Sequence, residues 1–151
     1  MKRKFLINLF LFPISLLSVV FLQLNISNLI SPSAVHATNW DKYNVSKKSG
    51  LRNLKSGNYQ KAVEFFTKAI NIYNSDSDSY YFRGEANQRL GNHNEAIADF
   101  KKSMTMDGTG YKANTNYMIG YSYIQLEDFD NALIHLNKAI SINSDEGGYY
   151  Y

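Results

Sequence analysis

The chain of 151 residues has 15% aromatic and 19% charged residues, a composition too apolar for an intrinsically disordered protein. Its formal net charge of +3 comes from Lys2, Arg3 and Lys4, because the sequence after residue 37 holds equal numbers of basic and acidic residues. A neutral domain without a Lys/Arg cluster lacks the electrostatic footprint of a nucleic-acid-binding protein. The chain has no cysteine, which excludes disulfides, thiol catalysis and thiolate metal sites.

An apolar segment follows the three N-terminal basic residues. Residues 5–24 contain no charged residue, and a basic start before a long apolar stretch directs a chain to a membrane. Val35 and Ala37 fit the small-residue pockets of a signal peptidase, which predicts cleavage between Ala37 and Thr38. A run of about 20 apolar residues can also span a bilayer. Residues 1–37 are therefore interpreted as a signal peptide or a membrane anchor, with the rest of the chain facing the periplasm, a lumen or the exterior.

Residues 38–151 contain an internal repeat. The segment that begins at Gly50 aligns with segments that begin at Gly84 and Gly120, at successive offsets of 34 and 36 residues. Each copy continues with apolar residues at helical spacing, which predicts amphipathic helices over residues 62–72, 96–106 and 132–142. Polar residues and glycines predict turns within the copies at 57–58, 91–92 and 127–128, and after the copies at 74–79, 107–110 and 143–148.

A helix-turn-helix unit of 34 residues with this pattern resembles the tetratricopeptide repeat. The resemblance spans residues 43–144 and implies an all-α fold, a short right-handed superhelix of three helix-turn-helix repeats. These repeats are expected over residues 43–76, 77–110 and 113–146, and residues 147–151 resemble the start of an incomplete fourth. A solenoid needs a polar cap over its last apolar face, which this segment does not supply. Either the chain is a truncated part of a longer array or a partner covers its end.

Small residues are expected where the two helices of each repeat cross. They are Gly50, Gly84 and Gly120 on the first helix and Ala62, Ala96 and Ala132 on the second. Phe66, Phe100 and Leu136 should fill the space beside them, and Ala69, Ser103 and Ala139 should face the next repeat. The family's closing proline is replaced by Asn74, Gly108 and Ser144, and its early aromatic residue survives only as Tyr80.

The sequence contains no recognisable constellation of catalytic or metal-binding residues. The three histidines fall in different predicted elements, and His93 stands where the sister repeats have Tyr59 and Phe129, so we expect it to substitute for an aromatic residue. The carboxylates at residues 127–130 lack the spacing of a calcium loop. We therefore expect a protein that is not an enzyme and has no catalytic residue, metal or cofactor.

In this family, the first helices of successive repeats line a concave groove that binds a peptide, and the resemblance implies such a groove here. By register, its lining residues are Asn44, Lys47, Leu51, Leu54, Lys55, Asp78, Tyr81, Glu85, Gln88, Arg89, Asn114, Tyr117, Tyr121, Ile124 and Gln125. Tyr81, Tyr117 and Tyr121 are of the type that anchors interfaces, although tyrosine is also simply abundant in this chain, with 12 copies.

Chaperone-type members of the family hold a peptide's terminal carboxylate in a basic clamp. Lys47 matches one member of that clamp, but Leu51, Phe82 and Met118 stand where other clamp groups would be, so a clamp is not expected. The predicted function is a protein–protein interaction scaffold that binds a peptide segment of another protein and assembles a complex at a membrane. The alternatives are a small-ligand or glycan-binding module and an accessory subunit of an enzyme.

Overall fold

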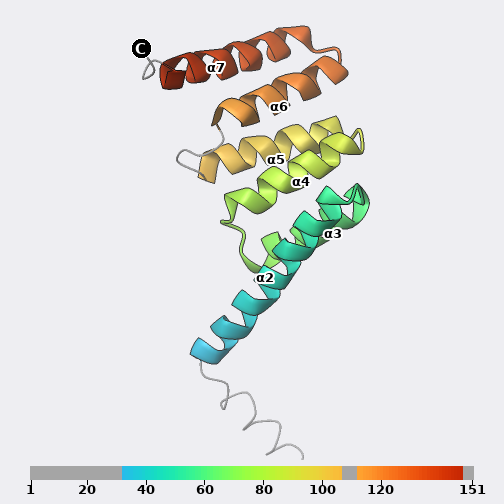
Figure 1. The fold of residues 1–151 in the computed structure, drawn as a ribbon, viewed down its shortest axis with the longest axis vertical. Helices are drawn as coiled ribbons and strands as arrows, with labels where there is room; N and C mark the ends of the chain where they lie inside the picture. The colour runs from blue at the N-terminus through green and yellow to red at the C-terminus, as the bar shows by residue number, and fades with distance from the viewer. Residues whose placement is uncertain (1–31, 107–111, 148–151) are drawn as a thin grey trace, which may run out of the picture. The chain divides into compact units, whose positions relative to one another are not determined.

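The structure, a computed structural model, describes residues 32–106 and 112–147. These residues form six α-helices and no strand, which confirms the predicted all-α fold (Figure 1). The helices are α2 (Pro32–Lys55), α3 (Tyr59–Ile72), α4 (Ser77–Arg89), α5 (His93–Met106), α6 (Lys112–Gln125) and α7 (Phe129–Gly147).

The chain divides into two compact units, residues 1–38 and residues 39–151. The apolar segment of residues 5–24 lies outside the described residues, and Ala37 and Thr38 of the predicted cleavage site lie within α2. Within the two described ranges, no helix is both long enough and apolar enough to cross a membrane.

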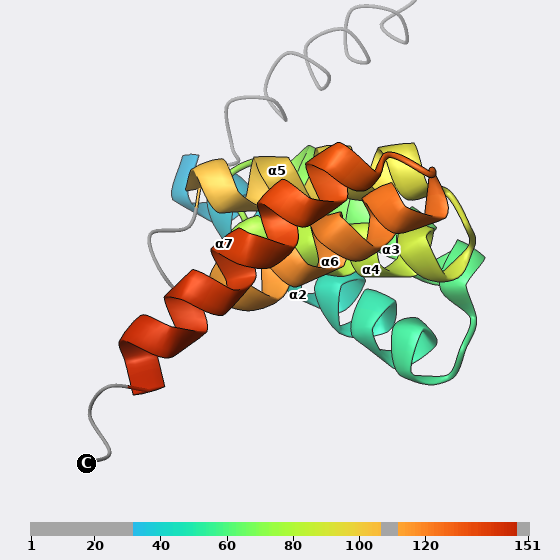
Figure 2. The ribbon, with the colours of Figure 1, turned by 90° about the horizontal axis from the view of Figure 1, so that it is seen from above.

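Figure 2 shows α4, α5, α6 and α7 stacked beside one another. The two helices of each repeat approach most closely at a glycine. A Cβ atom added to Gly50 would lie 2.7 Å from Cε1 of Phe66, and one added to Gly120 would lie 2.8 Å from Cγ of Leu136. The equivalent atom at Gly84 would lie 3.0 Å from Cδ1 of Phe100. Only a residue without a side chain allows these close approaches, which confirms the predicted crossing in all three helix pairs.

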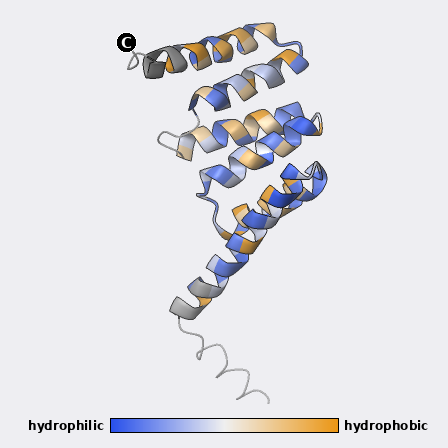
Figure 3. Cartoon of the chain, viewed as in Figure 1, coloured by the Kyte–Doolittle hydropathy of each residue, from blue (hydrophilic) through white to orange (hydrophobic). Residues whose placement is uncertain are grey.

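The core includes the small and aromatic residues that the repeat pattern predicts, together with others such as Ile97 and Ile119. Ala62, Phe66, Ala96 and Phe100 are fully buried, and Ala132 is 3% exposed. The residues predicted to face the next repeat, which are Ala69, Ser103 and Ala139, are also buried. Figure 3 shows hydrophobic residues along α5 and α7, whereas α4 is mostly hydrophilic.

Two of the predicted turns after the repeats are wrong in part. The run 74–79 was expected to be a turn, but α4 begins at Ser77, because Asp76 caps the helix by accepting a hydrogen bond from the backbone N–H of Ser79 at 3.1 Å. The run 143–148 was also expected to be a turn, but α7 continues to Gly147. Ser144 keeps the backbone N–H that the family's proline lacks, so nothing breaks the helix there. The run 107–110 lies outside the described residues.

The three turns inside the repeats share one conformation. Gly57, Gly91 and Glu127 have φ angles of 73°, 81° and 59°, in the left-handed region. The next residue in each turn donates a backbone hydrogen bond back into the first helix, as Asp128 does to the carbonyl of Tyr123 at 2.9 Å. This arrangement satisfies the last carbonyls of the helix and reverses the chain.

A polar cluster that the sequence analysis missed joins α3, α4 and α5. Arg83 on α4 donates through Nε and Nη2 to the two carboxylate oxygens of Asp99 on α5, at 2.8 and 2.7 Å. Its Nη1 donates to Oγ1 of Thr67 on α3 at 3.1 Å. The two-point contact with Asp99 is the strong geometry for a guanidinium and a carboxylate, and it joins α4 to α5 within the second repeat. The bond to Thr67 links the second repeat to the first.

Candidate functional site

An open hollow of about 400 Å³ lies between α4 and α6, and we call it the α4–α6 hollow. Its lining residues are Gln88, Arg89, Tyr117, Met118 and Tyr121. The volume falls within the usual range of small-ligand and side-chain pockets. Gln88, Arg89, Tyr117 and Tyr121 belong to the predicted groove, whereas Met118 was assigned only to an unused clamp position.

Two aromatic rings on α6 form the accessible part of the hollow. Tyr117 and Tyr121 are 52% and 41% exposed and lie one helical turn apart, so their side chains are neighbours on one face. The Arg89 side chain is 56% exposed, and its Nη2 lies 3.8 Å from the carboxylate of Glu85. Such a long, exposed ion pair is weak and leaves the guanidinium able to bind another anion.

The floor of the hollow is fixed by a buried amide. Nε2 of Gln88 donates to the carbonyl of Met118 at 2.8 Å and to Oγ of Ser122 at 2.7 Å. These bonds tie α4 to α6 across the interface between two repeats. The backbone that carries the tyrosines of α6 is therefore already held in place. This lowers the entropic cost of ordering the site when a segment binds.

Tyr81 does not belong to this accessible surface, so its prediction as an exposed anchor is wrong. It is 4% exposed and lies in a core cluster with Phe100 of α5 and Ile119 of α6. Its hydroxyl accepts a hydrogen bond from Nδ2 of Asn114. Tyr117 occupies the equivalent place one repeat later, but within the described residues no later helix covers it.

The predicted lining residues on α2 do not reach the hollow. Leu51 and Leu54 are half-buried against the core of the first helix pair, and Lys55 is exposed at the end of α2. The remaining predicted residues also lie outside the set that lines the hollow, and they are Asn44, Glu85, Asn114, Ile124 and Gln125. Of these, Ile124 is 38% exposed and lies further along α6.

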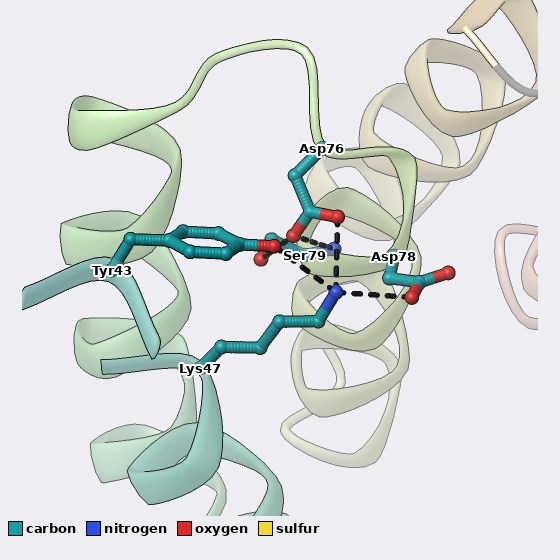
Figure 4. Close-up of polar contacts among 5 residues, drawn as sticks. All are labelled: Tyr43, Lys47, Asp76, Asp78 and Ser79. Carbon is teal, nitrogen blue, oxygen red and sulfur yellow. Dashed lines mark hydrogen bonds and ion pairs between the residues drawn. The ribbon is translucent and has the colours of Figure 1, made fainter. Parts of the chain in front are cut away.

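Lys47 and Asp78 meet in a polar cluster between α2 and the start of α4, which we call the Lys47 cluster (Figure 4). The Lys47 ammonium lies 3.0 Å from Asp76 and 3.0 Å from Asp78, and it donates to the Tyr43 hydroxyl at 3.2 Å. Asp76 also binds the backbone N–H and the hydroxyl of Ser79. The cluster fastens the first repeat to the second.

The charges of this cluster are stabilised by one another. Burial disfavours the charged form of Lys47, but hydrogen bonds to Asp76, Asp78 and Tyr43 outweigh it and raise its pKa. Burial likewise disfavours the charged form of Asp76, which by itself would raise its pKa. Hydrogen bonds from Ser79 and Lys47 outweigh this effect, and the pKa of Asp76 lies below its usual value. Because Lys47 is neutralised within the fold, it has no free charge for the terminal carboxylate of a peptide.

No group of three or more histidine or acidic side chains that could hold a metal ion is found among the residues described. His93 is half-buried at the corner between α4 and α5, and its ring centroid lies 6.5 Å from that of Tyr121, edge to face. This environment is that of an aromatic packing residue, as the sequence comparison between repeats indicates. The α4–α6 hollow can therefore contact a ligand through the rings of Tyr117 and Tyr121 and the guanidinium of Arg89.

Successive helix pairs that cross at glycines define an α-helical repeat fold, and in this chain the α4–α6 hollow lies on the first helices of two of these pairs. Two sequence profiles of the tetratricopeptide repeat match residues 53–76 and 76–145, and together they cover more than half of the chain. Residues 53–145 therefore belong to the tetratricopeptide-repeat family.

Two relatives are larger proteins. The protein SGT1 homolog of Oryza sativa subsp. japonica is 30% identical over 91 residues, which is 60% of this chain and 24% of the relative. Translocon at the outer membrane of chloroplasts 64 of Pisum sativum is 30% identical over 95 residues, which is 60% of this chain and 16% of the relative. The chain thus spans a quarter or less of the length of these relatives.

Solved structures show the same fold. MamA, in its MSR-1 C2 structure, has a TM-score of 0.64 and 25% identity over 69% of this chain and 59% of that chain. The Arabidopsis OM64 TPR domain has a TM-score of 0.65 and 23% identity over 71% of this chain and 87% of that one. The TPR2B domain of yeast Sti1, in a complex with pHsp70, has a TM-score of 0.63 and 21% identity over 72% and 86% of the two chains.

Proposed function

We propose that the repeat unit binds a segment of another protein in the α4–α6 hollow and that the chain acts as a non-enzymatic scaffold. The observation that carries this proposal is the pair of exposed rings, Tyr117 and Tyr121, held on a rigid support beside the Arg89 guanidinium. Tyrosine and arginine are the residue types that contribute most to protein interfaces, because they bury large surfaces and retain polar contacts.

The similar proteins support a protein ligand. The yeast Sti1 TPR2B domain was solved with pHsp70, and its fold extends over most of the described residues. The neutralised Lys47 argues against a clamp for a terminal carboxylate at α2. The ligand is therefore a peptide segment that lies against the tyrosines of α6 and offers a carboxylate or carbonyl to Arg89.

The sequence of residues 1–37 supports a location for this scaffold. Three basic residues before an uncharged apolar segment keep the N-terminus inside and send the following domain across a membrane. The scaffold then acts as a complex-assembly factor on the outer side, either tethered or released. A reporter fused after residue 106 should be active only outside the cytoplasm, and activity confined to the cytoplasm would overturn this location.

The binding site is tested by truncating the exposed rings. A partner is identified by crosslinking in the source cell, and its affinity for the parent chain is measured by calorimetry. Tyr117→Ala and Tyr121→Ala should each weaken binding by roughly thirtyfold, which corresponds to about 2 kcal/mol for an interface hot spot. Both side chains are largely exposed, so helicity and thermal stability should not change.

A matched control separates the hollow from the rest of the surface. Val45 on α2 is 64% exposed and lies outside the hollow, so Val45→Ala should bind like the parent. Full binding by both tyrosine variants would place the partner elsewhere. A sugar that raises the melting temperature of the parent, but not of the Tyr117→Ala variant, would instead identify a glycan-binding module.

A further inference from the structure

A second hollow lies between α3, α4 and α5, and we call it the α3–α5 hollow. Its volume of about 380 Å³ is within the range of pockets that hold a small ligand or a single side chain. None of the residues that line it also lines the α4–α6 hollow, so the two sites are separate. The lining residues are Val63, Thr67, Arg83, Asn87, Glu95, Ala98 and Asp99.

The junction between the second and third repeats shows which side chains meet at the equivalent position. Lys101 of α5 reaches across to α6, where its Nζ donates to the Tyr123 hydroxyl at 2.8 Å. The Tyr123 ring in turn stacks on His135 of α7, with a centroid distance of 5.7 Å. At this junction, the side chain of a lysine therefore bridges two repeats, and its ammonium ends on a polar group of the following repeat.

The equivalent side chains at the first junction are shorter. Because successive repeats stack in a similar way, shorter side chains leave space between them. The first junction therefore lacks the lysine side chain that the second junction receives from within the chain. By register, the shorter residues are Thr67 in place of Lys101, Asn87 in place of Tyr123, Ala98 in place of Ile134 and Asp99 in place of His135.

The charges of the α3–α5 hollow also favour a cation. Arg83 donates to both carboxylate oxygens of Asp99, so these two charges balance each other. Glu95 is exposed, and its carboxylate forms no ion pair with another residue of the described ranges. The hollow thus carries one excess carboxylate beside the apolar side chains of Val63 and Ala98. A lysine side chain has the matching form, with an apolar stem and a charged end.

We propose that the α3–α5 hollow binds a primary ammonium group at the end of an aliphatic chain, the chemistry that a lysine side chain of a partner protein and a free alkylamine share. The aliphatic chain lies along Val63 and Ala98, and the ammonium donates a charge-assisted hydrogen bond to the carboxylate of Glu95. A partner that fills both this hollow and the α4–α6 hollow gains affinity from the two contacts together.

Three probes test this site by nuclear magnetic resonance of the isotopically labelled full chain in micelles of an uncharged detergent. The lysine probe is N-acetyl-lysine N-methylamide, and its norleucine analogue has the same aliphatic chain without the ammonium. The lysine probe should shift the amide signals of residues that line the hollow. The norleucine analogue should bind at least roughly tenfold more weakly, because it cannot donate to Glu95.

The third probe, pentylamine, distinguishes the two sources of the ammonium group. It carries the lysine side chain without a peptide backbone. Saturable binding of pentylamine with an affinity equal to or above that of the lysine probe assigns the hollow to free amines. Weaker binding of pentylamine assigns it to a segment of a partner protein, because the backbone of the lysine probe then contributes contacts.

Substitutions show whether the probe binds in the hollow. Glu95→Gln should weaken binding of the lysine probe by at least roughly fivefold and leave helicity unchanged, because Glu95 is exposed. Asp41→Asn removes a charge at an exposed position of α2, outside the hollow, and should bind the probe like the parent.

A second pair of variants fills the hollow from within the chain. Thr67→Lys supplies a lysine at the position equivalent to Lys101 and should abolish binding of the probe. Thr67→Ser keeps the hydroxyl that accepts a hydrogen bond from Arg83 and should retain binding. Equal affinity of the norleucine analogue, unchanged affinity in Glu95→Gln, an equal loss in Asp41→Asn, or full binding by Thr67→Lys would each overturn the proposal.

Discussion

At the scale of single residues, the turn that joins α6 and α7 contains a residue in an unfavourable backbone conformation. Glu127 adopts a φ of 59°, where the two earlier repeats have Gly57 and Gly91. A left-handed conformation costs a residue with a side chain about 1–2 kcal/mol, and part of this is offset because glycine makes the unfolded chain more flexible. Glu127→Gly should therefore raise the free energy of unfolding by about 1 kcal/mol.

Chemical denaturation of the parent and variant checks this prediction. Glu127→Ala is the control, because alanine removes the charge and keeps the Cβ atom that makes the conformation costly. An equal gain in both variants would attribute the effect to charge and would contradict the backbone explanation.

The crossing of α4 and α5 tolerates no side chain at Gly84. A Cβ atom there would lie 3.0 Å from two ring carbons of Phe100 and 3.2 Å from the carbonyl oxygen of Ala96. The backbone oxygen cannot move without separating the helices, so Gly84→Leu should lower stability by about 3 kcal/mol, at the upper end of overpacking costs. The melting temperature measures this loss, and Ala98→Leu, at an exposed position on α5, should leave it nearly unchanged.

At the scale of helices, the pair α6–α7 depends on a partly buried histidine. Nδ1 of His135 lies 2.9 Å from Oδ1 of Asn116, and its ring stacks on Tyr123 at a centroid distance of 5.7 Å. Lys101 of α5 donates to the Tyr123 hydroxyl at 2.8 Å. Burial, together with the charges of Lys138 and Lys101, lowers the pKa of His135 below its ordinary value.

This lowered pKa predicts a pH-dependent stability. Below a pH of about 6.5 the unfolded chain binds a proton at residue 135 more readily than the folded chain, so the free energy of unfolding falls as the pH falls. His135→Gln should remove this dependence between neutral and mildly acidic pH, where carboxylates remain ionised. Denaturation curves across that range test it, and an unchanged slope in the variant would assign the dependence to another group.

The ends of the helices show which local signals the sequence carries. Asp76 followed three residues later by Ser79 is a capping pattern, and it explains why α4 starts inside a run that was expected to be a turn. The end of α7 was misplaced because a polar run was taken as a helix stop, although Ser144 does not break a helix. Helix boundaries depend on such single contacts, whereas the existence of the helices follows from the repeat.

At the scale of the whole molecule, the repeat pattern predicts the crossing residues and the core, because each copy places the same residue type at the same site. It does not predict which lining residues are accessible. Tyr81 and Tyr117 occupy equivalent positions, yet one is buried and the other is 52% exposed, because among the described helices only Tyr81 is covered by a following repeat. Lys47 is likewise neutralised by two carboxylates that lie outside its own helix.

The same dependence on neighbours predicts how stability is distributed along the repeat unit. In a solenoid, each repeat contacts only its neighbours, so an inner repeat is stabilised on two sides and an outer repeat on one. The pair α4–α5 is joined to the first repeat by Arg83 and to the third by Gln88, whereas α7 leaves Leu133 and Ile140 exposed. Amide hydrogen exchange of a dilute sample should therefore be slowest in α4 and α5. Exchange in α7 should be at least roughly tenfold faster, a difference of about 1.4 kcal/mol in local opening.

Replacing Gln88 with Ala should leave α4 and α5 protected and increase exchange in α6 and α7 together, because it removes the hydrogen bonds to Met118 and Ser122. Equal exchange in all helices of the parent would show a single cooperative unit and would contradict this nearest-neighbour account.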